Sequence, residues 1–190
     1  MLHQLDPGPQ FPKVVRMIVE IPKGSNNKYE YDVNLGVFRL DRTLYSPMHY
    51  PGDYGFIPGT LATDGDPMDI IVLEDSGTFT GCLLEARPVG VLRMADEKGP
   101  DEKILAVPER NPRFDEIQTV DEVPPHVRLE LEHFFDIYKE LEGKKTEIKG
   151  WLGLKETHEF MQRARERYVE LQPPAKERDK RPEARDGRKD

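Results

Sequence analysis

Between residues 14 and 107 the chain contains short β-type segments in close succession, with no helical repeat of apolar residues between them. The segments are rich in β-branched or aromatic residues and end at proline, glycine or polar turn residues, which is typical of strands. Short strands without crossover helices favour a small antiparallel barrel or a strongly curled sheet. The segments that we expect to form strands are 14–21, 28–33, 36–40, 69–73, 88–94 and 103–107.

Two helices are expected after these strands, so the predicted fold class is α+β and mainly β. Pro124 and Pro125 suit a first helical turn, and Gly143 suits the end of that helix. A second helix is predicted over about residues 155–171, with Trp151 between the two helices. The apolar stripe of the first helix consists of Val127, Leu131, Phe134, Tyr138 and Leu141, and the inner face of the second consists of Phe160, Ala164, Tyr168 and Leu171.

The end of the chain differs in composition from the rest. Residues 173–190 are charged, contain three prolines, and have only alanine as apolar content. Such a segment buries too little apolar surface to offset its ordering entropy. With 190 residues in total, the chain is expected to form a single catalytic domain over 1–172, followed by a flexible tail over 173–190.

The charge balance limits the possible partners. There are 36 acidic and 28 basic residues, for a formal net charge of −8. Duplex nucleic acid and anionic membranes require a broad basic surface, so neither is an expected partner. The single cysteine, Cys82, cannot form an intramolecular disulfide, which fits a reducing compartment. The chain begins without a signal-peptide pattern and has no apolar stretch of membrane-spanning length, so a cytoplasmic protein is expected.

The segment Asp64-Gly65-Asp66-Pro67-Met68-Asp69 is the densest chemical signal in the sequence. From Asp64 to Glu85 there are six acidic residues and no basic one. Closely spaced carboxylates repel one another unless cations offset the repulsion, and oxygen-only ligands suit hard ions such as Mg²⁺. The spacing does not match an EF-hand loop. Because Asp and Gly also form ordinary turns, this segment taken alone is compatible with a purely structural turn.

A second acidic group, Asp96-Glu97 with Asp101, lies in a predicted loop and could supplement the first. Several cations and tyrosines that could bind phosphate oxygens are spread along the chain, although Lys and Arg on strands and helices usually face solvent. No phosphate-binding loop, nucleophile elbow or His-x-x-x-His zinc spacing is present. The cation and tyrosine candidates are Lys28, Arg42, Tyr50, Tyr54, Lys103, Tyr138 and Lys139.

Taken together and in this order, these groups resemble the soluble inorganic pyrophosphatase family of the Mg²⁺-dependent, β-barrel, bacterial type. Asp-Gly-Asp-Pro-x-Asp followed by aliphatic residues is similar to the signature of that family, and the resemblance covers about residues 12–171. It implies a five-stranded, OB-like closed barrel with two packed C-terminal helices, a homohexamer, and hydrolysis of pyrophosphate with several Mg²⁺ ions in each active site.

The resemblance also implies a role for each residue. Asp64, Asp69 and Asp101 would hold the two metals that share the attacking water, and Asp66 would act as general base. Asp96, with Asp101, would bind a substrate-borne metal, and Glu20 and Glu30 would orient metal-bound waters or a further metal. Tyr50 and Glu97 would contact and orient these residues without binding metal or substrate themselves. The residues expected to hold pyrophosphate oxygens are Lys28, Arg42, Tyr54, Lys103, Tyr138 and Lys139.

This combination of residues suits the chemistry. Metal ions neutralise the charge of pyrophosphate and lower the pKa of a water, while basic groups stabilise the leaving phosphate.

Two alternative functions remain open from the sequence alone. One is an OB-like module for single-stranded nucleic acid, which the acidic charge opposes. The other is a hydrolase for another phosphoanhydride, such as a nucleotide or a short polyphosphate.

Overall fold

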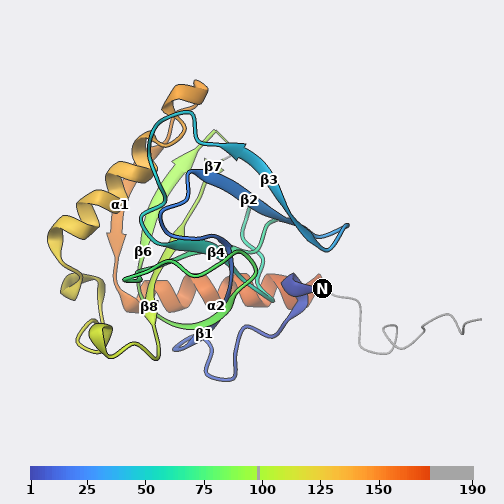
Figure 1. Cartoon of the computed structure of the whole chain (residues 1–190). Helices are drawn as coiled ribbons and strands as arrows, with labels where there is room; N and C mark the ends of the chain where they lie inside the picture. The colour runs from blue at the N-terminus through green and yellow to red at the C-terminus, as the bar shows by residue number, and fades with distance from the viewer. Residues whose placement is uncertain (98, 172–190) are drawn as a thin grey trace, which may run out of the picture.

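The computed structural model describes residues 1–97 and 99–171, and the predicted tail over 173–190 lies outside this range (Figure 1). Strands make up most of the regular structure, and two α-helices come late in the chain, which confirms the mainly β fold with two helices. The strands are β1 (Val15–Ile21), β2 (Asn27–Asp32), β3 (Val37–Thr43), β4 (Asp53–Ile57), β5 (Met68–Val72), β6 (Leu83–Asp96), β7 (Gly99–Pro100), β8 (Lys103–Pro108) and β9 (Glu147–Leu152). The helices are α1 (Pro125–Ile137) and α2 (Leu154–Glu170), with short 3₁₀ turns η1 (Leu2–Gln4), η2 (Pro112–Phe114), η3 (Val120–Glu122) and η4 (Glu140–Glu142).

Five strands of the larger sheet pair in a ring. β1 pairs with β4 and β6, β4 with β5, β5 with β8, and β8 with β6. The expectation of wholly antiparallel pairing is wrong at one place, because β5 and β8 are parallel. Parallel neighbours require a crossover connection, and the long strand β6, which lies between them in sequence, provides it.

The local pattern predicted some strands and missed others. The expected segments 14–21, 69–73, 88–94 and 103–107 correspond to β1, β5, β6 and β8. The segments 28–33 and 36–40 form a separate two-stranded sheet, β2–β3, rather than part of the ring. β4 and β9 were not predicted. β4 lies next to a segment rich in proline and glycine, and for the region of β9 the sequence predicts only that Trp151 lies between the two helices.

Gly55, in the middle of β4, is required by a close approach to β1. A Cβ atom at this position would lie 2.0 Å from the Ile18 carbonyl oxygen and 2.9 Å from the Glu20 amide nitrogen. Backbone atoms of a paired strand cannot move aside as a flexible side chain can. We therefore expect Gly55→Ala to lower the free energy of unfolding by about 3 kcal/mol, the upper end of the usual range for overpacking, as measured by urea denaturation.

Gly153, at the N-cap of α2, provides the matched control. Its φ is −79°, and a Cβ there would meet only the Glu156 carboxylate at an ordinary 3.6 Å. Gly153→Ala should therefore change the stability by less than about 1 kcal/mol. Equal losses for the two variants would show that the contact with β1 is not what makes Gly55 necessary.

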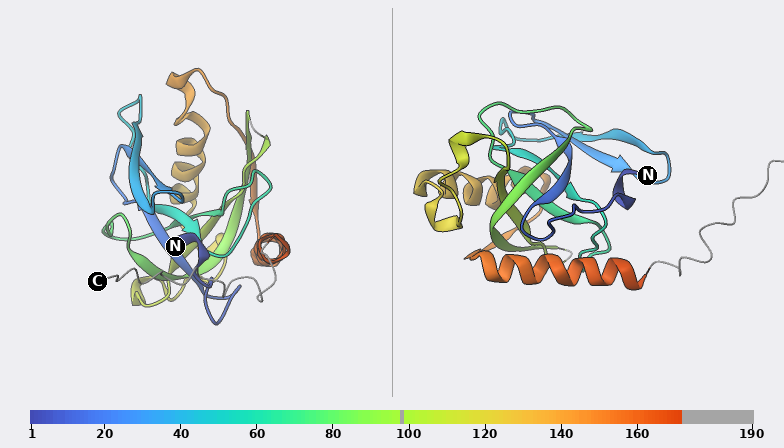
Figure 2. Two further views of the ribbon diagram at one scale, coloured as in Figure 1. Left: turned by 90° about the vertical axis from the view of Figure 1, so that its right-hand side faces the viewer. Right: turned by 90° about the horizontal axis from the view of Figure 1, so that it is seen from below.

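The core has two parts, each covered by one helix. α1 packs on one part through Leu131, Phe134 and Phe135, and α2 packs on the other through Met161 and Ala164. Figure 2 shows α2 running along the outside of the β structure, away from α1. In the described part of the chain, no helix combines the length and apolar character needed to cross a membrane.

Two residues that were expected on buried helical faces are exposed. Leu141 is 63% exposed, because α1 ends at Ile137 and the chain continues as the tighter turn η4. Leu171 is 73% exposed because it lies beyond the last residue of α2. Tyr138 is buried, as predicted, although it is the C-cap residue just beyond the end of α1.

Candidate active site

A cavity of about 430 Å³ lies between the β2–β3 sheet, the ring of strands and the turn after α1. It gathers side chains that are far apart in the sequence, including both acidic groups and the cations. Every residue to which the sequence assigned a site role lines this cavity, except Tyr50. These residues are Glu20, Lys28, Glu30, Arg42, Tyr54, Asp64, Asp66, Asp69, Asp96, Glu97, Asp101, Lys103, Tyr138 and Lys139.

The Asp64–Asp69 segment forms a turn that enters β5. The Asp66 amide donates a hydrogen bond to Asp64 Oδ1 at 3.1 Å, and the Asp66 carbonyl accepts one from the Ala62 amide at 2.7 Å. Gly65 has φ +94°, a backbone conformation that glycine adopts readily. As a result, Asp64 and Asp66 are exposed at the cavity mouth, while Asp69 is half-buried on β5.

Lys103 forms the buried centre of the acidic wall. Its side chain is only 3% exposed, and its Nζ contacts the carboxylates of Asp69 and Asp101. Burial alone would lower the pKa of Lys103, but attraction from Asp69 and Asp101 outweighs it and raises this pKa above its usual value. The ammonium therefore stays charged, and its Nζ also lies 5.7 Å from the centre of the Tyr54 ring.

A second ion pair, between Lys139 and Asp96, lies near the C-terminal end of α1. Lys139 Nζ is 2.7 Å from Asp96 Oδ2 and 5.3 Å from the centre of the Tyr138 ring. On the facing sheet, Lys28 contacts Glu30 and lies 3.7 Å from Asp41. The contact between Lys28 and Glu30 agrees with the prediction that they share one strand face.

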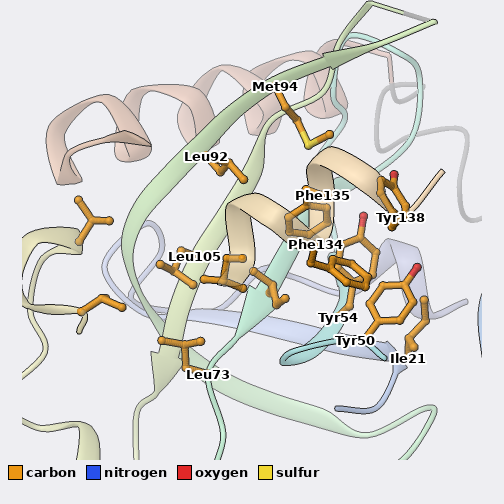
Figure 3. Close-up of a cluster of buried hydrophobic side chains, with 14 of the residues drawn as sticks. Ile21, Tyr50, Tyr54, Leu73, Leu92, Met94, Leu105, Phe134, Phe135 and Tyr138 are labelled. Carbon is orange, nitrogen blue, oxygen red and sulfur yellow. The ribbon is translucent and has the colours of Figure 1, made fainter. Parts of the chain in front are cut away.

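The tyrosines form the apolar floor behind these charges. Tyr50 is buried, and its ring centre lies 5.4 Å from that of Tyr54 and 4.9 Å from that of Phe134. Figure 3 shows these rings together with Tyr138 at one end of the cluster beneath α1. Burial raises the pKa of the Tyr50, Tyr54 and Tyr138 hydroxyls. The phenols therefore keep their protons and can donate hydrogen bonds.

The donors on the acidic wall suit a hard divalent cation. Within residues 1–97 and 99–171, no three His, Cys, Asp or Glu side chains are already placed around one point to hold a metal ion. The wall nevertheless offers carboxylate oxygens, which Mg²⁺ prefers, and Asp69 and Asp101 lie close enough to share one cation, the Lys103 ammonium. Burial raises the pKa of Glu20 to about 8 and also raises the pKa of Asp101, so added positive charge here would stabilise the ionised carboxylates.

Several cavity residues were missed by the sequence reasoning. Asp41 and Lys144 carry charge into the cavity, and Asp41 could have been suspected because it directly precedes Arg42. His3 also lines the cavity, and its carbonyl accepts a hydrogen bond from the Gly59 amide at 2.9 Å. Nothing local in the sequence marks His3, because only the packing of the N-terminal turn against Gly59 and Tyr31 brings it to the cavity.

Comparison with known proteins shows to which family this chain belongs. The family model described as inorganic pyrophosphatase matches residues 17–169. This chain belongs to the inorganic pyrophosphatase family. The matched range contains every predicted site residue, from Glu20 to Lys139, and leaves out His3.

Individual members of the inorganic pyrophosphatase family are similar to this chain in sequence and in structure. An inorganic pyrophosphatase of Methanosarcina acetivorans is 51% identical over 158 residues, which is 83% of this chain and 94% of that protein. One from Geobacillus stearothermophilus is 50% identical over 141 residues, covering 74% and 86% of the two chains. The crystal structure of the Thermus thermophilus inorganic pyrophosphatase superposes with a TM-score of 0.87 at 46% identity, covering 88% of this chain and 98% of that one.

Proposed function

We propose that this chain hydrolyses inorganic pyrophosphate to two orthophosphates and uses Mg²⁺ as its cofactor. The observation that carries the proposal is the single cavity that joins a carboxylate wall to a set of lysine, arginine and tyrosine donors. A carboxylate wall alone would bind metal without gripping phosphate, and a basic wall alone would bind phosphate without activating a water. Membership of the inorganic pyrophosphatase family supports the same activity.

The acidic wall would hold the metal ions. Asp64, Asp69 and Asp101 would bind two of them, Asp96 with Asp101 would bind a substrate-borne one, and Glu20 and Glu30 would orient waters. When bound, Mg²⁺ supplies positive charge to the phosphates and lowers the pKa of a nearby water. Lys103 Nζ contacts one oxygen of each carboxylate, Asp69 Oδ2 and Asp101 Oδ1, so the other oxygen of each could bind the cation.

Asp66 would act as the general base. Its carboxylate is exposed at the cavity mouth, on a turn fixed by the hydrogen bond of its own amide to Asp64, so it can accept a proton from a water facing the phosphorus. Lys28, Arg42, Lys103 and Lys139, together with the hydroxyls of Tyr54 and Tyr138, would hold the phosphate oxygens and stabilise the charge of the leaving phosphate. Tyr50 and Glu97 would support them, Tyr50 from behind Tyr54 and Glu97 through Lys144 at 3.5 Å.

One assay tests the proposed function against its alternatives. Phosphate release is measured from pyrophosphate, ATP and tripolyphosphate, in Mg²⁺ and in excess chelator. We expect rapid release from pyrophosphate that stops when the chelator is added. An absence of Mg²⁺-dependent release from pyrophosphate, or a clear preference for ATP or tripolyphosphate, would overturn the proposal.

Together with this activity we propose a closed barrel, the extent of the catalytic domain, an oligomeric state and a location. The ring of pairings among β1, β4, β5, β8 and β6 supports a closed, OB-like five-stranded barrel, and residues 1–172 would form the whole catalytic domain. The resemblance to bacterial members favours a homohexamer in the cytoplasm, and the net charge of −8 argues against a nucleic-acid or anionic-membrane partner. The molar mass in solution, measured by light scattering, should equal six times the chain mass of 21.9 kDa. A monomer mass would contradict the hexamer without affecting the activity.

Arg42→Lys tests the phosphate grip. A guanidinium presents a planar fork of donors, whereas an ammonium is a point charge, so we expect kcat/KM for pyrophosphate to fall by about 10-fold or more. Arg39→Lys on the same strand is the control, because Arg39 is exposed and pairs only with Asp32 among the described residues. Steady-state phosphate release from both variants should show the loss in Arg42→Lys alone. A normal KM and kcat for Arg42→Lys would exclude a forked contact there.

A further inference from the structure

The Arg42 side chain is hydrogen-bonded to the carboxylate of Glu142, which is far away in the sequence. Its Nε–H donates a hydrogen bond to Glu142 Oε1 at 2.6 Å, across 100 residues of chain. The Glu142 side chain is only 7% exposed, although its neighbours Glu140 and Leu141 are exposed in the same turn. Arg42 lines the cavity, whereas Glu142 is not among the described residues that line it.

The turn that carries Glu142 also carries a predicted substrate-binding residue. η4 starts immediately after Lys139, and the Glu142 amide donates a hydrogen bond to the Lys139 carbonyl at 3.0 Å. Gly143 follows with φ +74°, and the Lys144 amide turns back to the same Lys139 carbonyl at 3.3 Å. The position of Glu142 is thus tied to that of Lys139, and through Glu142 the turn is tied to Arg42 on β3.

The contact with Glu142 leaves other donors of the Arg42 guanidinium available. A guanidinium has five N–H donors. In the described structure Nε is used by Glu142, and one Nη1 donor is used by Asp41. Among the described residues the Nη2 group makes no hydrogen bond, so its donors are available to an anion. An arginine fixed in this way loses less side-chain entropy when it binds than a mobile one does.

The charges around Glu142 explain why its carboxylate can be buried. Glu142 Oε2 lies 3.7 Å from Lys144 Nζ, so the carboxylate has a cation on each side. A buried carboxylate is costly unless it is paired and hydrogen-bonded. Lys144 in turn lies 3.5 Å from Glu97, and none of these contacts involves the carboxylates proposed to hold the two catalytic metals.

We propose that Glu142 is a positioning residue for pyrophosphate hydrolysis, which holds the Arg42 guanidinium so that its free edge faces the substrate. This inference rests on the proposed function. It differs from a purely structural role, in which Glu142 would only fasten η4 to β3. A positioning role makes the effect of Glu142 on activity depend on Arg42, and a structural role does not.

The experiment compares Glu142→Ala and Glu142→Gln with Glu140→Ala, which removes an exposed carboxylate from the same turn. Losing a charge-assisted hydrogen bond should lower kcat/KM for pyrophosphate by about 10- to 100-fold in Glu142→Ala. Glu142→Gln, whose amide oxygen can still accept from Nε, should lose about 3- to 10-fold. Glu140→Ala should match the wild type. The Mg²⁺ concentration for half-maximal rate should be unchanged in all three variants, while calorimetry should show weaker binding of inorganic phosphate to Glu142→Ala.

The deciding measurement repeats the Glu142 variants in an Arg42→Lys background. Lysine has no Nε–H donor at that position, so each Glu142 change should then cost less than about 3-fold. Effects that simply multiply in the double variants, or a Glu142→Gln enzyme as active as the wild type, would overturn the proposal. If Glu142→Ala fails to fold, Glu142→Gln alone decides by the same comparison. Failure of the proposed function would be seen separately, because wild type and Glu140→Ala would then release no phosphate from pyrophosphate.

Discussion

Asp66→Asn is expected to lower kcat for pyrophosphate hydrolysis by about 10²–10⁴-fold, the range for loss of a general base. Asparagine has nearly the same shape as aspartate, and the hydrogen bond from the backbone amide of residue 66 to Asp64 does not involve the side chain of residue 66. The turn should therefore persist, while the side chain of residue 66 loses the ability to accept a proton. Steady-state phosphate release at saturating Mg²⁺ and pyrophosphate measures the effect directly.

Two further measurements make the Asp66 result specific. The Mg²⁺ concentration for half-maximal rate should change little, because Asp64, Asp69 and Asp101 remain in place. Asp115→Asn, which makes the same chemical change at an exposed aspartate outside the cavity, should be fully active. If Asp66→Asn released phosphate at the wild-type rate, Asp66 could not be the base, and another group would have to take the proton.

Lys103→Met is expected to reduce both activity and stability. Removing a buried donor that faces the developing charge should lower kcat by about 10²–10³-fold. It also leaves the carboxylates of Asp69 and Asp101 without the ammonium that both contact. Breaking such a pair should cost about 3 kcal/mol of unfolding free energy, the low end of the range for buried pairs because Asp69 stays partly exposed.

Metal should restore part of that stability. In chelator the two carboxylates have lost their cation, whereas in Mg²⁺ a divalent ion can supply the missing positive charge and stabilise the native state by binding to it. Urea denaturation of Lys103→Met in chelator and in Mg²⁺ should therefore differ more than it does for the wild type. Lys149→Met removes a more exposed lysine of β9. It should change neither kcat nor the free energy of unfolding. Equal stability of Lys103→Met and wild type in chelator would contradict the central role of this ion pair.

Strands with a strong local pattern were predictable, and strands defined by their partners were not. β1, β5 and β8 have runs of β-branched and aliphatic residues that indicate strands without any tertiary context. β4 contains Asp53, Tyr54 and Gly55, which do not form such a run. It becomes a strand because it fits between β1 and β5, where Gly55 allows the close approach.

The candidate site divides in the same way. The order of the motifs along the chain predicted most of the residues that line the cavity, since they stand in short recognisable groups such as Asp64–Asp69. Glu142 and His3 carry no such signal. Their relation to the site depends on contacts with Arg42 and Gly59 that are distant in sequence.

The sequence by itself determined the chemistry available to this protein: carboxylates concentrated between residues 64 and 101, and cations and tyrosines on either side of them. Those properties depend on residue type and local spacing. Only the tertiary structure decided that the two sets line one cavity, that Lys103 lies buried between Asp69 and Asp101, and that Glu142 holds Arg42. These relations arise from strand pairing and from the packing of α1, which bring together residues up to 100 positions apart, and no local pattern records which distant residues will meet.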